Sequence, residues 1–172
     1  MIFITGDCHG NFERFNPSIF PEQKEMTKED YVIICGDFGG VWHKDEESPE
    51  ETMVLDWLES RPFTTLFVCG NHENFDRLYQ YPIEDWHGGK VQKITENIIH
   101  LCRGSVFEID GKRIFAFGGA ESHDAIYRIY GESIWLQESI TNEQIKKTIS
   151  NCKDVDFVIS HCAPSDFLLK MF

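Results

Sequence analysis

The sequence predicts an α/β fold built as a single domain of 172 residues, and three observations support this prediction. Short, nearly continuous apolar runs recur, which is typical of strands covered on both faces. Segments that begin with helix N-cap signals separate several of these runs. The middle of the chain carries a hairpin signal instead, so the βαβ pattern is expected to give way to antiparallel strands there.

Four apolar runs are predicted as strands, and each is followed by a residue type that can bind metal. The first run opens the chain, stops at Gly6 and leads into Asp7 and His9. The next three runs are residues 31–35, 64–69 and 155–159. They lead, in that order, into Asp37, Asn71 and His161.

Two helices are predicted from their N-terminal signals. Ser48 offers an N-cap, with Pro49 at the first helical position and Glu51 at the third. Thr141 and Gln144 repeat the same capping pattern. The apolar face expected of the first helix comprises Met53, Val54, Trp57 and Leu58, and that of the second comprises Ile145 and Ile149.

Asp110 and Gly111 separate two β-rich runs, residues 105–109 and 112–117. An Asp-Gly pair in this position is the strongest short hairpin signal. Residues 98–102 are expected to add a third antiparallel strand. The predicted order is therefore βαβ units first, a meander in the middle and a return to α/β.

Composition excludes several classes of function. The 16 Lys and Arg residues against 29 Asp and Glu give a net charge of −13, which argues against nonspecific nucleic-acid binding. No apolar run has the length of a membrane span, and the N-terminus has no signal-peptide pattern. The six cysteines show no CxxC spacing, so reduced thiols and a cytoplasmic location are expected. The oligomeric state is open, and an oligomer is one of the options.

The strand ends predict a metal site. In open α/β folds ligands bind beyond the carboxyl ends of the strands, so the polar residues there are expected to share one crevice if the four strands are neighbours. Carboxylate, imidazole and amide donors suit borderline divalent ions. In an extended chain residues two apart point the same way, so Asp7 and His9 could reach one ion while Cys8 faces the protein interior.

Simpler interpretations stand beside this one. Asn71 could be a helix N-cap, and Asp7 and Asp37 could be ordinary turn residues. His72 and His161 could be structural histidines. Cysteines near the proposed ligands could offer thiolates, although cysteine commonly fills core space as a small hydrophobe; they are Cys8, Cys35, Cys69 and Cys162. One further histidine, His123, could also reach the crevice.

The ordered motifs resemble those of the calcineurin-like metallophosphoesterase superfamily, especially its small bacterial and phage members. The stretches that carry the resemblance are "YVIICGDFGGVW", "FTTLFVCGNHENFD" and "VISHCAP", together with the initial Asp7-x-His9. The resemblance covers essentially the whole chain. It implies a two-sheet α/β sandwich with helices outside and a site with two divalent ions that hydrolyses phosphate esters, with a metal-bound hydroxide as nucleophile.

The resemblance also implies a role for each site residue. Asp7 and His9 would hold the first ion, and Asp37 would bridge both. Asn71 and His161 would hold the second ion. His72 would be catalytic and face the scissile phosphate and its leaving group. The two divalent ions (Mn, Fe, Zn, Co or Ni) would supply the local positive charge that an acidic chain needs to bind an anionic substrate.

The sequence departs from the superfamily pattern at its end. The usual Gly-His-x-His segment is missing, and after His161 the chain runs to Phe172 with a helix N-cap signal at Ser165 or Asp166. The domain is therefore expected to be C-terminally incomplete, with weaker metal binding and low activity. The alternative is a catalytically silent metal-binding fragment.

A second departure concerns the substrate. Protein serine/threonine phosphatases of the superfamily carry an Asp-Arg-Gly after their Gly-Asp, whereas this chain continues from Asp37 with Phe38 and Gly39. The arginine that would bind phosphate is therefore missing from that position. Small phosphodiesters or phosphomonoesters are the expected substrates, and no membrane partner is expected.

Overall fold

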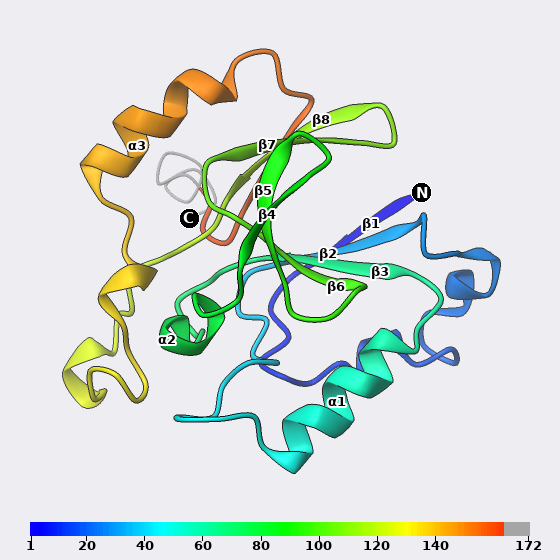
Figure 1. The fold of residues 1–172 in the computed structure, drawn as a ribbon, viewed down its shortest axis with the longest axis horizontal. Coiled ribbons are helices and arrows are strands. Elements are labelled where there is room, and N and C mark those ends of the chain that lie inside the picture. Colours follow the sequence, from blue (N-terminus) through cyan, green and yellow to red (C-terminus); the bar gives the residue numbers. More distant parts are fainter. Residues whose placement is uncertain (164–172) are drawn as a thin grey trace, which may run out of the picture.

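The computed structural model describes residues 1–163, and its strands form two sheets (Figure 1). The larger sheet has the order β1-β2-β3-β6-β5-β4 and the smaller β7-β8-β9. The strands are β1 (Ile2–Thr5), β2 (Tyr31–Cys35), β3 (Thr64–Val68), β4 (Ile83–Trp86), β5 (Gly89–Lys93), β6 (Ile98–Leu101), β7 (Ser105–Ile109), β8 (Lys112–Phe117) and β9 (Phe157–Ser160). The predicted α/β class with two mixed sheets is confirmed.

The helices are short and lie outside the sheets (Figure 1). The α-helices are α1 (Pro49–Glu59), α2 (Phe75–Leu78) and α3 (Asn142–Thr148). The 3₁₀ turns are η1 (Glu13–Phe15), η2 (Pro21–Glu25), η3 (Ala125–Tyr127), η4 (Leu136–Glu138) and η5 (Ile149–Cys152). Within residues 1–163, no helix has the length and apolarity needed to cross a membrane. The cap predicted at Ser165 or Asp166 lies outside the described residues.

The parallel strands β2 and β3 lie inside the larger sheet, with β1 at its edge, and they send alternate side chains to opposite faces. On one face, Ile34 and Phe67 pack with Leu55 and Leu58 of α1. On the other, Leu66 packs in one apolar cluster with residues of β7, β8 and β9. The central strands are thus covered on both sides, which explains their continuous apolar sequence.

Both predicted helix caps are confirmed. The Ser48 hydroxyl accepts from the Glu51 amide, and the Glu51 carboxylate accepts from the Ser48 amide, which closes a capping box on α1. Thr141 and Gln144 close the same box on α3. The predicted apolar face of α1 is wrong at Met53, whose side chain is 70% exposed, because the buried row instead runs through Glu51 and its i+4 and i+7 neighbours.

Ile145 of α3 and Ile149, which follows its last residue, are both exposed, so the apolar face predicted for that helix is not buried. The predicted hairpin is confirmed: β7 and β8 pair across Asp110 and Gly111, both with positive φ as a type I′ turn requires.

The prediction that residues 98–102 add a third antiparallel strand to this hairpin is wrong. Strand β6 lies in the larger sheet, parallel to β3 and antiparallel to β5. All four of its side chains are buried, which fits a central strand better than a hairpin edge.

Candidate metal centre

The five residues predicted to bind metal lie together beyond the ends of β1, β2, β3 and β9. Nε2 of His9 lies 3.5 Å from Oδ2 of Asp37 and 4.0 Å from Oδ2 of Asp7. Nε2 of His161 lies 3.2 Å from Oδ1 of Asn71 and 3.6 Å from Oδ1 of Asp37. We refer to these five residues as the donor cluster.

The strands that deliver the donor cluster are not all neighbours in one sheet, contrary to the condition on which the sequence prediction rested. β1, β2 and β3 are adjacent, but β9 belongs to the smaller sheet. His161 nevertheless reaches the cluster because the two sheets pack face to face through a shared apolar core. The convergence therefore depends on sheet packing as well as on strand order.

The first two donors are positioned by a turn. The Asp37 carbonyl accepts hydrogen bonds from the amides of Cys8 (3.0 Å) and His9 (2.8 Å). His9 and Asp37 both have positive φ, 48° and 49°, a conformation that is uncommon outside glycine and clusters at functional sites. The expected extended geometry at Asp7-x-His9 is thus wrong, whereas the expected burial of Cys8 is confirmed.

His161 is oriented so that one ring nitrogen remains available to the donor cluster. Its Nδ1 lies 2.9 Å from the Cys35 carbonyl, and a carbonyl can only accept, so Nδ1 carries the proton. In a neutral ring Nε2 would then carry the lone pair, and it faces the oxygens of Asn71 and Asp37. The Asn71 amide nitrogen donates to the Ser122 hydroxyl at 3.1 Å, which leaves its oxygen directed at His161. Such outer contacts fix ligand orientation in metal sites.

Two glycines leave the space that the donors occupy. A Cβ on Gly70 would lie 2.0 Å from Oδ1 of Asp37, and a Cβ on Gly36 would lie 2.3 Å from Nδ1 of His161. Any larger residue would therefore displace a donor. The glycines before the predicted ligands are needed for close approach.

The donor cluster fits the divalent ions that the sequence predicts. Within residues 1–163, Asp7, His9 and Asp37 form a group whose potential ligand atoms all lie within 4.8 Å of one another. His161 and Asn71 add an imidazole nitrogen and an amide oxygen beside Asp37. Mixed oxygen and nitrogen donors suit borderline ions such as Mn, Fe, Co, Ni and Zn.

His72 is tied to the donor cluster through its backbone and to a cation through its ring. Its amide donates to Oδ1 of Asp37 at 2.8 Å. Nη2 of Arg128 lies 2.6 Å from Nε2 of His72, and Nε of Arg128 lies 2.9 Å from Oδ1 of Asp124. Burial lowers the pKa of His72, and the Arg128 charge lowers it further while Asp37 opposes the shift.

Sequence reasoning missed Arg128. It lies in an irregular segment next to η3, where no periodicity or motif marks it. The nearby residue that was singled out, His123, is exposed, whereas its neighbour Ser122 contacts Asn71.

Glu73 is a second residue that sequence reasoning missed, and its side chain holds the backbone next to the donor cluster. Its carboxylate is 1% exposed and accepts from the amides of Phe38 (2.9 Å), Gly39 (3.4 Å) and Gly70 (3.3 Å). Burial raises its pKa to about 8, although those amides oppose the shift. Glu73 thereby joins the loops that follow β2 and β3.

Two of the four cysteines near the centre, Cys8 and Cys69, behave as core residues, whereas Cys35 is half-buried and Cys162 is exposed. Cys8 packs in the apolar cluster under α1, and burial raises the pKa of its thiol to about 11. Cys69 is also buried, and burial raises its pKa too. Raised pKa values favour the neutral thiol, so these two side chains match the small-hydrophobe interpretation.

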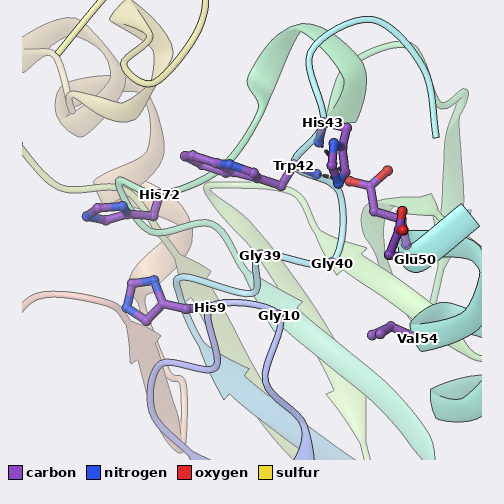
Figure 2. A pocket seen from close by; sticks show the side chains of 10 residues that line it. His9, Gly10, Gly39, Gly40, Trp42, His43, Glu50, Val54 and His72 are labelled. Carbon is purple, nitrogen blue, oxygen red and sulfur yellow. Dashed lines mark hydrogen bonds between the residues drawn. The ribbon is translucent and has the colours of Figure 1, made fainter. Parts of the chain in front are cut away.

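A cavity of about 260 Å³ opens beside the donor cluster (Figure 2). His9 and His72 lie at one end, with their ring centroids 5.1 Å apart. Figure 2 shows Trp42 above the loop of Gly39 and Gly40, away from the sheet. The cavity therefore extends from the donor cluster along the side chain of Trp42, which forms one of its walls.

Comparison with known proteins identifies relatives of the chain. A family model described as calcineurin-like phosphoesterase matches residues 1–170. Lariat debranching enzyme A of Xenopus laevis is 29% identical over 136 residues, which cover 72% of this chain and 24% of the relative. The lariat debranching enzyme of Schizosaccharomyces pombe is 29% identical over 130 residues (69% and 26%), and that of Homo sapiens 25% over 136 residues (72% and 24%). The chain thus spans about a quarter of the length of these relatives. No solved structure matches it significantly.

Proposed function

Because the chain belongs to the calcineurin-like phosphoesterase family, we propose that it hydrolyses phosphate esters at the donor cluster with two divalent metal ions. The observation that carries the proposal is the convergence of two carboxylates, two imidazoles and one amide from four separate strand ends. Scattered turn residues would have no reason to converge. A catalytic metal centre needs this arrangement.

The ligand roles follow the distances within the donor cluster. Asp7 and His9 would hold one ion, and Asn71 and His161 the other. Asp37 has one carboxylate oxygen near His9 and the other near His161, so it is the residue suited to bridge them. Two divalent ions, when bound, supply a hydroxide nucleophile near neutral pH and offset the charge that builds up on the phosphate oxygens.

Two further side chains are proposed to act on the phosphate. In the hydrolysis an oxygen from water bonds to phosphorus, the bond to the ester oxygen breaks, and that oxygen leaves with a proton. Arg128 would bind a phosphate oxygen, since its guanidinium is a planar donor held against His72. His72 would donate a hydrogen bond to the leaving oxygen.

A small phosphate ester is the proposed substrate. The net charge of −13 disfavours a long polyanion, because such binding depends on many phosphate contacts from Lys and Arg. The second candidate is a lariat branch, which the names of the relatives favour. If a branched oligonucleotide inhibits hydrolysis of a small diester more tightly than its linear counterpart does, the second candidate is correct. The cytoplasmic location expected from the sequence stays a prediction.

The proposal is tested by metal-dependent turnover. Purified chain should hydrolyse a chromogenic phosphodiester when Mn²⁺ is added, and Asp37→Asn should abolish that activity and reduce the bound metal measured by elemental analysis. Asp56→Asn, an exposed change on α1, is the matched control. If no divalent ion stimulates turnover while metal still binds, the alternative of a catalytically silent metal-binding fragment replaces this one.

A further inference from the structure

The cavity beside the donor cluster has the features of a substrate pocket. At about 260 Å³ it is slightly smaller than the roughly 300–1,000 Å³ typical of small-molecule sites. His9 and His72 lie at one end, and Glu50 and Val54 of α1 lie at the other (Figure 2). A phosphate held at the histidines would therefore direct its ester group along the Trp42 side of this cavity.

The Trp42 segment is fixed by a buried polar network. Glu51 accepts hydrogen bonds from the amides of Trp42 and His43, and Asn74 donates to the carbonyls of the same two residues at 3.2 and 2.8 Å. Arg77 donates to the His43 carbonyl (3.1 Å) and to the Glu51 carboxylate (2.6 Å).

Burying a charge pair is costly unless its geometry is good and further hydrogen bonds satisfy its remaining donors and acceptors. Glu51, Asn74 and Arg77 are each at most 7% exposed. The network joins the cap of α1 and the cap of α2 to the loop that leads from β2 into α1. A wall that is already ordered lowers the entropic cost of binding a rigid ligand.

The Trp42 ring is placed to receive a flat group. It is half-buried, and it lies 6.3 Å from the His72 ring with only 28° between the planes. Trp135 supports it edge-on at 6.0 Å. Trp135 thus holds the Trp42 ring on one side, and another side of this ring faces the cavity, as a stacking surface requires.

The far end of the cavity carries an unused acceptor. Among residues 1–163, no hydrogen bond or ion pair engages the exposed Glu50 carboxylate, which lines the cavity. A carboxylate there would attract a hydrogen-bond donor and repel an additional phosphate. This combination favours one esterified aromatic ring with a donor on its outer edge over an extended polyanion.

Resting on the proposed function, we infer that this cavity binds the ester group of the substrate, a flat aromatic ring that stacks on Trp42 and donates a hydrogen bond to Glu50. An amino-substituted nucleobase has this chemistry. The substrate class is therefore a mononucleotide-type phosphate ester with an amino group on its base.

Binding of three small phosphates to the full chain tests the inference, with titration calorimetry as readout. Adenosine monophosphate should bind more tightly than ribose 5-phosphate, and Trp42→Ala should remove roughly 5- to 100-fold of that affinity, the range expected for one stacked base. Trp42→Phe should keep most of it. Glu50→Gln should reduce the preference for adenosine monophosphate over inosine monophosphate, which lacks the amino group.

Trp86→Phe, on β4 of the larger sheet, is the matched control and should bind all three compounds like the parent chain. If Trp42→Ala lowers the melting temperature, Trp42→Phe and Glu50→Gln still test the pocket. Equal affinity of the parent chain for adenosine monophosphate and ribose 5-phosphate overturns the inference. If the parent chain shows the base preference but no metal-dependent diester hydrolysis, the proposed function is overturned instead.

Discussion

Nη2 of Arg128 lies 2.6 Å from Nε2 of His72, although 56 residues separate them. A guanidinium only donates hydrogen bonds, so Nε2 of His72 accepts and the imidazole is neutral with its proton on Nδ1. The pair places a fixed positive charge beside the donor cluster of an acidic chain. We therefore propose Arg128 for the phosphate-binding role for which the sequence offers no arginine after Asp37.

Arg128→Gln is expected to lower kcat/KM for a phosphodiester about 100-fold, because one charged donor to the phosphate is removed. Inorganic phosphate should also become a weaker inhibitor. Arg128→Lys should recover part of both losses, since lysine restores the charge without the planar fork. Steady-state kinetics with phosphate inhibition measure these effects.

Arg61→Gln is the control for removing a positive charge, since Arg61 packs over the ring of Trp57 on α1. It should leave kcat/KM and phosphate inhibition unchanged. Wild-type kinetics in Arg128→Gln would show that the contact with His72 only packs the segment around η3.

Gly70→Ala is expected to weaken metal binding without changing any donor. The added Cβ would lie 2.0 Å from Oδ1 and 2.5 Å from the amide nitrogen of Asp37, so the Asp37 carboxylate, which is proposed to bridge the ions, must move. Changes that disturb ligand orientation typically cost 10- to 100-fold in metal affinity, and a Mn²⁺ titration should show a loss of about this size. Gly6→Ala, where nothing lies within 4 Å, should titrate like the parent chain. Equal affinities for both variants would contradict the assigned position of Asp37.

Breaking the Glu51–Arg77 pair is expected to destabilise the fold. The two side chains are 6% and 8% exposed, and their atoms lie 2.6 Å apart. Glu51→Gln leaves a buried guanidinium without its partner, which typically costs about 3–5 kcal/mol. Urea unfolding should show this loss, whereas Asp56→Asn at the surface of α1 should show almost none. A change below about 1 kcal/mol would mean that the other hydrogen bonds of the network suffice.

The local features of the fold were predictable because they depend on neighbours in the chain. The capping box at Ser48 and the turn at Asp110 require only a few adjacent residues. The position of β6 was not predictable in this way. Its place between β3 and β5 is a pairing choice that depends on burial on both faces.

The donor cluster shows the same division. The sequence placed Asp7 and His9 together, but for the wrong reason, because His9 is left-handed and not extended. Ser122 and Arg128 were missed because their contacts with Asn71 and His72 span more than 50 residues. Such contacts arise only from packing, and no local pattern encodes them.

His100 makes stability depend on pH in a predictable direction. Its ring lies in β6 against Phe67, with centroids 5.1 Å apart, and Nδ1 lies 3.1 Å from Oε1 of Gln92. The Gln92 amide nitrogen donates to the carbonyls of Leu78 and Tyr81. Its oxygen therefore accepts from His100, and Nε2 of His100 is buried with no hydrogen-bond partner among residues 1–163.

Burial, together with the charge of Arg103, lowers the pKa of His100 to about 3 in the folded chain, against about 6.5 when unfolded. The unfolded chain therefore binds an extra proton between these values, so the folded state loses stability as the pH falls below about 6.5, by up to about 1.4 kcal/mol per pH unit. His100→Gln keeps a donor for Gln92 and cannot titrate, so its unfolding free energy should fall less steeply between pH 6.5 and 4. Urea unfolding across that range measures the difference, with the surface change His123→Gln as control. Parallel pH profiles for His100→Gln and the parent chain would contradict a lowered pKa of His100 in the folded chain.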